Sequence, residues 1–460
     1  MKHTTTILTL IFILYSCSDN FLNEKPSTNI IVPSSLEDFR NLLDYTGFQV
    51  LNKTCALGQL ASDDYEYVDY DSYRSVPTLT ERNSYIWAKD IFGGEIDRLD
   101  WNSPWGTIFY ANNVLKGLKA VDREVNPTLF DDTQGWALFV RAYAMYDLAR
   151  NFSPAYDSQT ADTDLGIPLR LQPEIDILLP RATVEQTYNQ IIGDAKYAAE
   201  LLGSDYQPTY KNRPSKSACF AFLARVYLSM NNYEQAEAYA DNALSLYDKL
   251  MDYNDISTTS STPFSNTNDE LIFASNQVND YITTATTSSN SYVTVNRELL
   301  SLYHPSDLRL LLYFGTSNTG HIFVKRGYYG SGLYPFSGLA TDELFLIKAE
   351  CLARRNTPKD AIAVLNHLLA HRYESNAFNP LQAIDAEEAL ATILNERRKE
   401  LVWRGIRWSD LKRLNKIGAN IVLRRQLGGE EFVLSPNDPK YVFPIPDDEI
   451  TRSGITQNQR

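Results

Sequence analysis

Two histidines and a pair of adjacent carboxylates are the side chains whose spacing could support metal binding or acid–base catalysis. His367 and His371 stand four residues apart on an expected helix, so both imidazoles share one face. Leu368 follows His367, however, and the glutamate of the H-E-x-x-H zinc motif is missing. Asp63 and Asp64 are adjacent, but a chain with 57 Asp and Glu residues contains such pairs by chance. Because no nucleophile-elbow, phosphate-loop or dinucleotide motif occurs either, we assign no catalytic residue and no metal or cofactor site.

Aromatic side chains that lie among polar residues suit a different chemistry, the binding of sugars. A flat indole or phenol can cover the apolar C–H face of a sugar ring while Asn, Asp or Arg bonds the hydroxyls. Trp87 and Trp101 have polar neighbours, so we expect their rings to stay partly exposed, whereas Trp105 leads an apolar helix face and is expected in the core. The candidate ligand-binding residues are Trp87, Trp101, Asn102, Tyr73, Arg74, Tyr281, Tyr328 and Tyr329.

The third group with distinctive chemistry is the thiol of Cys17. Lys2 and His3 precede an apolar run that ends at Tyr15, which is too short for the ~20 residues of a membrane span but suits a signal peptide. Leu14-Tyr15-Ser16-Cys17 resembles a bacterial lipobox, in which the cysteine is lipidated and becomes the first residue of the mature chain. We expect residues 1–16 to be a lipoprotein signal peptide and acyl chains on Cys17 to hold the protein on a membrane. Ordinary signal cleavage beside a chance cysteine is the alternative.

Composition indicates a large globular protein. The chain has 460 residues, of which 43% are hydrophobic and 22% charged, so it can bury a sizeable core. A net charge of -14 argues against nucleic-acid binding, which needs basic patches. Cys55, Cys219 and Cys351 form no C-x-x-C motif, and we expect neither a disulfide framework nor a zinc site.

The elements that must position these residues are mainly helices. Apolar residues at helical spacing predict helices over 105–118, 135–150 and 183–202. A serine of the pair Ser34-Ser35, and Thr183 and Ser215, are expected to cap helices. The segments 215–247 and 341–372 have the small and aromatic residue spacing of tetratricopeptide (TPR) helical hairpins. Residues 55–104 and 253–340 lack such a period and are expected to be loop-rich insertions, which in compact domains are usually functional.

A cluster of charged and aromatic residues near the end of the chain permits two interpretations. Arg397, Arg398, Glu400, Arg407 and Asp410 could bind an anionic ligand, since a guanidinium suits a carboxylate. We favour the structural interpretation, in which these groups pair with each other and tie the last helices to the C-terminal tail.

Several segments, in this order along the chain, together resemble one known family, SusD/RagB. They are LYSCSDNFLNEKPS, the helix from Trp105 to Leu118, RAYAMYDLAR, LGIPL, ARVYLSMNNYEQAEAYADNAL, ERRKELVWRGIRWSDLKRL and YVFPIPDDEI. The family's RWxDL signature is present as Arg407-Trp408-Ser409-Asp410-Leu411, although the histidine common before it is Ile406 here. Family members are surface lipoproteins of Gram-negative bacteria that bind nutrients beside TonB-dependent transporters.

The resemblance implies a mostly α-helical fold, with residues 17–460 as one domain. TPR-like helix pairs within about 105–250 and 341–414 would form a scaffold, and the loop-rich insertions would carry the ligand site. It also implies an outer-membrane, cell-surface location, a glycan or glycopeptide ligand, a SusC-like TonB-dependent transporter as partner, and no catalysis.

Two other functions stay open. A TPR-type scaffold that binds peptides or proteins is disfavoured by the non-tandem repeats and the large insertions. A surface glycosidase needs two carboxyl groups at a set separation in a cleft, which a sequence does not reveal.

Overall fold

The computed structural model describes residues 33–46, 50–203, 210–285, 292–330 and 332–460. Cys17 and the expected signal peptide lie outside the described residues. The longer helices are α2 (Leu36–Asp44), α6 (Leu99–Gly117), α7 (Pro127–Phe152), α8 (Val184–Leu201), α9 (Lys216–Ser229), α10 (Tyr233–Leu246), α13 (Thr341–Arg354), α14 (Pro358–Leu369), α15 (Ala386–Glu400) and α16 (Arg407–Lys416). The shorter ones are α3 (Leu57–Ala61), α4 (Tyr70–Ser75), α5 (Leu79–Tyr85), α11 (Arg297–Ser301), α12 (Arg309–Tyr313) and α17 (Asp447–Ser453).

Strands in the described part of the chain are short and form two-stranded sheets. The pairs are β1 (Lys53–Thr54) with β6 (Asn276–Gln277), β2 (Tyr65–Tyr67) with β7 (Val293–Val295), β3 (Leu165–Pro168) with β4 (Arg181–Thr183), β5 (Leu271–Phe273) with β10 (Leu339–Ala340), β8 (Phe314–Thr316) with β9 (Ile322–Val324), and β11 (Leu423–Leu427) with β12 (Glu430–Leu434). The mostly α-helical fold class predicted from the sequence is confirmed.

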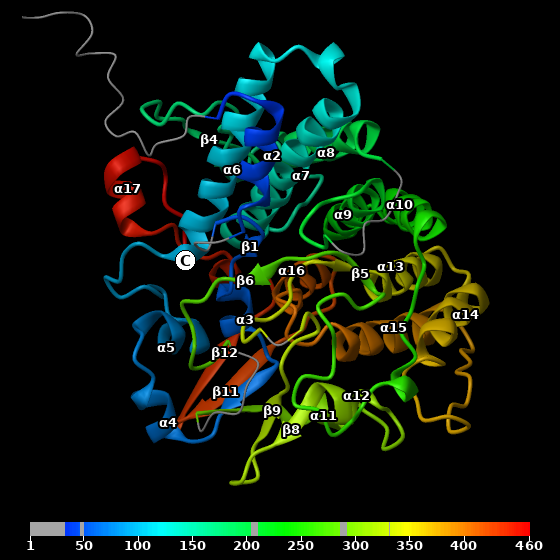
Figure 1. The fold of residues 1–460 in the computed structure, drawn as a ribbon. Coiled ribbons are helices and arrows are strands. Elements are labelled where there is room, and N and C mark those ends of the chain that lie inside the picture. The colour runs from blue at the N-terminus through cyan, green and yellow to red at the C-terminus, as the bar shows by residue number, and fades with distance from the viewer. Residues whose placement is uncertain (1–32, 47–49, 204–209, 286–291, 331) are drawn as a thin grey trace, which may run out of the picture.

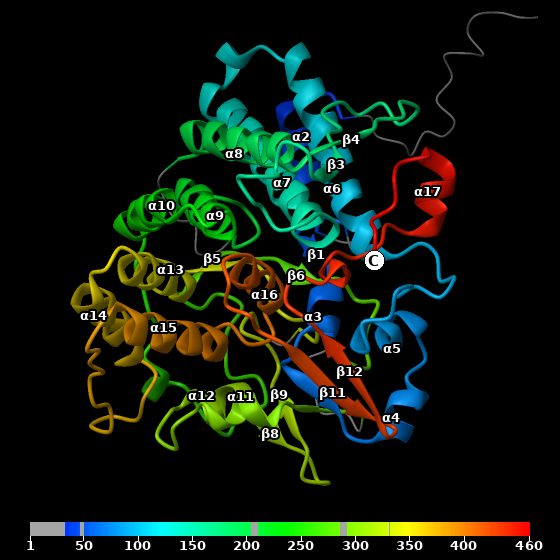
Figure 2. The same ribbon diagram turned by 180° about the vertical axis from the view of Figure 1, so that it is seen from behind.

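The long helices pack against their neighbours in sequence and build a continuous scaffold (Figure 1). Helix α7 lies between α6 and α8, α9 pairs with α10, and α13 pairs with α14 and α15. Small residues make these contacts close, since Ala236, Ala240 and Ala243 of α10 are completely buried. Figure 2 shows the same scaffold from behind, with α4, α11, α12 and the β8–β9 hairpin along the lower side of the molecule.

The predicted helix starts are confirmed where the capping signal is local. Ser35 and Asp38 form a capping box at the start of α2, and Thr183 and Gln186 form another at the start of α8. Ser215 accepts a hydrogen bond from the amide of Ala218 and caps α9. These side chains satisfy amide groups that the first turn of a helix leaves without partners.

The two insertions share a second core, which is rich in tyrosine. Strand β2 from the first insertion pairs antiparallel with β7 from the second, with Tyr65 opposite Val295. Their buried side chains form one aromatic cluster with members such as Tyr67, Tyr85 and Tyr313. Most tyrosines of this cluster therefore act as core residues, and the insertions are packed bodies rather than open loops.

Candidate ligand-binding surface

The two tryptophans proposed as exposed platforms are buried, so the expectation of partly exposed rings is wrong. Helix α6 begins at Leu99, which places Trp101 on its core side with 2% of the residue exposed. The ring of Trp101 meets the Phe152 ring edge-on at 5.0 Å between centroids. Trp87 is also 2% exposed, and its indole N–H donates to the Ala61 carbonyl at 3.0 Å. Neither ring can present a face to a sugar in this structure.

Two of the proposed tyrosines are buried as well. The hydroxyl of Tyr281 donates to the carboxylate of Asp100 at 2.5 Å, and that of Tyr328 donates to Glu270. Burial, and then the Asp100 charge, raises the pKa of Tyr281 well above its ordinary value. Each phenol is thus a core side chain whose hydroxyl is satisfied by a buried carboxylate from a distant part of the sequence.

Tyr329 and Asn102 keep part of their surface and belong to different insertions. The half-buried Tyr329 ring lies 6.3 Å from the Phe336 ring, in the second insertion. Asn102 is exposed on the outer side of α6.

Tyr73 and Arg74, in contrast, lie together with a third residue, Tyr70, on helix α4. The rings of Tyr70 and Tyr73 are stacked, with 6.1 Å between centroids and 19° between planes. The Arg74 guanidinium lies 5.8 Å from the centre of the Tyr70 ring. Tyr70 is 47% exposed and Arg74 is exposed, whereas Tyr73 is half-buried. We call Tyr70, Tyr73 and Arg74 the α4 surface.

Local structure holds the α4 surface in place. The Asp69 carboxylate accepts the Ser72 amide at 2.7 Å and caps α4, and this hydrogen bond lowers the pKa of Asp69. The inner ring, Tyr73, is fixed edge-on against Tyr67 of the aromatic core at 5.3 Å. One aromatic ring is thus anchored in the core while its stacked neighbour faces solvent.

The turn between β11 and β12 supports the outer ring and was missed in the sequence. Gly428 has a φ of +62°, and a Cβ there would lie 2.8 Å from the Tyr70 ring. The Gly428-Gly429 pair between two short alternating strands is a hairpin-turn signal that sequence reasoning could have used. Nothing local links it to Tyr70, since the contact joins positions more than three hundred residues apart.

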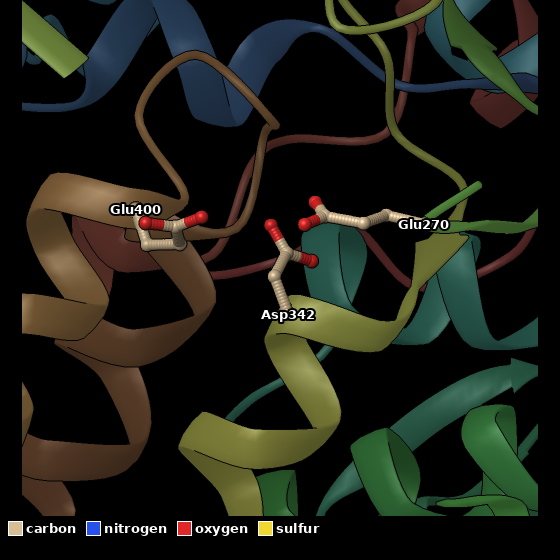
Figure 3. Close-up of side chains that lie close together, drawn as sticks. All are labelled: Glu270, Asp342 and Glu400. Atoms are coloured by element: carbon tan, nitrogen blue, oxygen red, sulfur yellow. The ribbon is translucent and has the colours of Figure 1, made fainter. Parts of the chain in front are cut away.

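Three buried carboxylates, Glu270, Asp342 and Glu400, lie within 4.8 Å of one another and form the cation-site candidate of the described residues (Figure 3). Arginines already occupy their oxygens. Arg372 bridges Glu270 and Glu400 at 2.8 Å each. Arg404 donates to both oxygens of Asp342, at 2.9 and 2.5 Å. The group is therefore an ion-pair junction, in which N–H donors hold the positions that a cation would need.

Two carboxyl groups of this junction, Asp342 and Glu400, have pKa values shifted in opposite directions. Burial raises the pKa of Asp342 to about 6, against the opposing effect of Arg404. Burial acts in the same sense on Glu400, but Arg372 and Arg309 outweigh it and lower the pKa of Glu400 to about 2. Glu400 is thus ionised throughout the physiological range, as a carboxylate between two guanidinium groups should be.

The structural interpretation of the cluster at 397–410 is confirmed only in part. Arg398 and Arg407 pair with Asp63, and Glu400 pairs with Arg309 and Arg372, all outside the cluster. Arg397 donates to Asp410 at 2.8 Å, and both side chains are largely buried. Trp408 donates from its indole N–H to the Tyr441 carbonyl at 3.0 Å and stacks on Phe443 at 5.5 Å. The last long helix is thereby tied to the C-terminal tail.

Membrane attachment through a spanning helix has no support in the described residues. No helix there is both long enough and apolar enough to cross a bilayer.

Comparison with known proteins identifies the family. A family model described as "Starch-binding associating with outer membrane" matches residues 20–228, and a model described as "SusD family" matches residues 341–460. The SusD-like protein P2 of Formosa agariphila is 24% identical, and the alignment covers 98% of each chain.

Solved structures share the fold at low sequence identity. A SusD superfamily protein from Bacteroides thetaiotaomicron matches with a TM-score of 0.73 and 20% identity, over 93% of this chain and 100% of that one. A SusD-like carbohydrate binding protein from Bacteroides vulgatus matches with a TM-score of 0.65 and 20% identity, over 92% of this chain and 97% of that one. With the two matched models covering most of its length, the chain belongs to the SusD/RagB family.

Proposed function

We propose that this protein is a surface glycan receptor that captures oligosaccharide and passes it to a TonB-dependent transporter without chemical change. The observation that carries the proposal is the α4 surface, where the stacked Tyr70 and Tyr73 rings lie beside the Arg74 guanidinium. The family descriptions name starch binding and the outer membrane, and one structural neighbour is called a carbohydrate binding protein.

Binding at this surface would combine two contacts. The exposed Tyr70 ring covers the C–H face of a sugar, and Arg74 donates hydrogen bonds to hydroxyls at the ring's edge. A single platform of this kind binds in the range of about micromolar to millimolar. A long glycan that engages many anchored copies is nevertheless retained, because binding to the second copy is effectively intramolecular.

Delivery depends on where the receptor is held. Acyl chains on Cys17 would keep it on the outer membrane, facing outwards and next to the transporter. Non-catalytic capture fits the donor set of the α4 surface, whose ring and guanidinium groups bind ligands but offer no nucleophile. The glycosidase and peptide-scaffold alternatives remain outcomes of the test below.

The test compares three single variants for binding to a panel of polysaccharides, oligosaccharides and glycopeptides. We expect Tyr70→Ala and Arg74→Ala to weaken binding of the recognised glycan about tenfold each, by loss of the stacking face and of a charged donor. Tyr197→Ala is the matched control, since Tyr197 is a 45% exposed tyrosine on α8. Calorimetry gives the affinities, and circular dichroism checks the fold.

Three results would contradict the proposal. They are equal binding by the α4 variants and the wild type, release of shortened sugars from the panel, and binding of unglycosylated peptides in preference to any glycan.

A further inference from the structure

Two arginines beside the stacked rings have no acidic partner in the described part of the chain. Arg74 belongs to the α4 surface, and Arg82 lies on α5, which Figures 1 and 2 both show next to α4. The chain has 57 acidic and 43 basic residues, so carboxylates are in excess. Arg141, Arg225 and Arg413 accordingly form buried ion pairs. Two neighbouring guanidinium groups without such partners leave positive charge available at this surface.

The N–H groups of Arg82 are poorly satisfied by the described residues. Its Nη1 lies 3.5 Å from the Arg74 carbonyl oxygen, which is the outer limit of a hydrogen bond. Its Nε–H is buried and has no hydrogen-bond partner among the residues described. Arg372, by comparison, donates to Glu270 and Glu400 at 2.8 Å each. Because a guanidinium has five N–H donors, Arg82 retains donor capacity for an acceptor from outside the chain.

The two guanidinium groups lie close to the two stacked rings. Arg74 is 5.8 Å from the centre of the Tyr70 ring. Burial raises the pKa of Tyr73, and the charge of Arg82 is the largest effect that opposes this rise, so Arg82 acts on the Tyr73 phenol. A sugar that covers the exposed Tyr70 ring therefore brings its substituents into the field of both cations.

The acids around the α4 surface leave these cations unneutralised. Asp69 caps α4, and Glu431 forms an ion pair with Arg424 across the β11–β12 hairpin. Asp71 and Glu430 are exposed, and in the described structure neither forms an ion pair with either guanidinium group. Water and salt screen such separated surface charges, so they oppose an incoming anion only weakly.

We propose that the α4 surface selects anionic glycans, whose carboxylate or sulfate ester is bound by Arg74 and Arg82 while the sugar ring stacks on Tyr70. The planar fork of an arginine donates paired hydrogen bonds to the oxygens of such groups, and these charge-assisted bonds are stronger than bonds to neutral hydroxyls. This inference rests on the proposed function, since it names the ligand class of the same surface.

The experiment measures binding of the full-length protein to polysaccharides in matched pairs that differ only in charge. The pairs are polygalacturonate with its methyl ester, hyaluronan with its carboxyl-reduced form, and a sulfated galactan with its desulfated form, beside starch and xyloglucan as neutral polymers. We expect calorimetry to find the tightest binding with an anionic polymer and at least about tenfold weaker binding after its charge is removed. Added NaCl should weaken the binding of the anionic form more than that of the neutral form.

Variants test the two arginines directly. Arg74→Gln and Arg82→Gln should each weaken binding of the preferred anionic polymer about tenfold, with a smaller loss for its neutral form, because glutamine keeps an N–H donor but no charge. Arg82→Lys keeps the charge and should retain part of the affinity. Arg297→Gln is the matched control, since Arg297 is exposed, forms no ion pair in the described residues and follows β7 at the end away from α4. Thermal unfolding checks that each variant is folded.

The outcomes separate this inference from the proposed function. Tightest binding to a neutral polymer, lost in Tyr70→Ala, overturns the inference and leaves the proposed function standing. Equal binding of charged and neutral forms, or an equal loss in Arg297→Gln, also overturns it. Sensitivity to esterification or carboxyl reduction assigns the anion as a uronate, and sensitivity to desulfation assigns it as a sulfate ester; either supports the inference. Absence of binding to every glycan would overturn both proposals.

Discussion

Arg372 illustrates how a charge deep in this protein is stabilised by partners far away in the sequence. Its side chain is completely buried and is bonded to Glu270, just before β5, and to Glu400, the last residue of α15. Glu400 in turn accepts from Arg309 at 2.8 Å. Removal of one member leaves an unpaired buried charge, which is costly even where the intact pair contributes little.

The first prediction follows from this pairing. Arg372→Met removes the guanidinium that bridges Glu270 and Glu400. Glu400 keeps its pair with Arg309, but Glu270 loses the arginine that balances its buried charge, so we expect the free energy of unfolding to fall by about 3–5 kcal/mol. Arg355→Met is the control, because the Arg355–Glu237 pair is partly solvent-exposed and such pairs contribute at most about 1 kcal/mol. Denaturant titrations followed by tryptophan fluorescence measure both changes. An equal loss of stability in the two variants would refute the claim that the buried ion pair matters more than the exposed one.

The second prediction concerns pH. Burial, and then the charge of Asp63, raises the pKa of Asp64 from 3.8 to about 6, against the opposing effects of Arg398 and Arg407. Between these two pH values the folded protein binds the proton and the unfolded chain does not, so this group makes stability fall as pH rises towards 6. Above pH 6 the buried Asp64 carboxylate is ionised, and its full destabilising effect on the fold remains.

Asp64→Asn should remove this cost. We expect the variant to melt a few degrees above the wild type at pH 7.5, with the difference vanishing near pH 4, where folded Asp64 is already neutral. Melting curves at several pH values measure this effect, with Asp162→Asn at an exposed position as control. A constant offset at all pH values would show that Asp64 does not titrate as described.

At the scale of elements, the contact between α2 and α6 depends on the absence of a side chain. Gly117 ends α6, and a Cβ there would overlap the Phe39 ring of α2. We expect Gly117→Ala to destabilise the protein by about 1–3 kcal/mol, because the helices must separate. Gly193 lies within α8 with nothing near its missing Cβ, so Gly193→Ala should be neutral or stabilise by up to about 1 kcal/mol. Thermal unfolding of both variants tests this difference. Similar shifts in melting temperature for the two variants would contradict the close contact between Gly117 and Phe39.

Helix starts show which parts of the fold could be predicted from the sequence. Those of α2, α8 and α9 were predictable because the capping residue stands beside the helix. Helix α6 has no side-chain cap at Arg98; the amide of Leu99 instead donates to Asp280 at 3.1 Å, from the other insertion. No local signal therefore marked the helical position of Trp101, and its burial was missed for that reason.

The candidate site could likewise be predicted from the sequence only in part. Tyr73 and Arg74 were identified because they are aromatic and charged residues of one polar segment. Which aromatic rings stay exposed depends on long-range packing, as in the bonds of Trp87 to Ala61 and of Tyr281 to Asp100. Composition cannot distinguish a ring that rests on the core from one that belongs to it.

At the scale of the whole molecule, the predicted lipidation of Cys17 is the proposed means of membrane attachment. Cys17→Ala should move the protein from the membrane fraction to the soluble fraction, because the acyl chains are the expected anchor. Fractionation followed by immunoblotting measures the shift, and mass spectrometry of the wild-type N-terminus tests for acylation directly. An unmodified N-terminus in membrane-bound wild-type protein would refute the lipid anchor.

The ion-pair junction of Figure 3 also limits how this protein can be re-engineered. Glu270 and Arg309 belong to the second insertion, whereas Arg372 and Glu400 belong to the helical scaffold. A chimaera that grafts residues 253–340 from a relative onto this scaffold would join charges selected in two different proteins. Such a graft should fold only where donor and recipient carry matching acids and arginines, or where both halves of each pair are transplanted together.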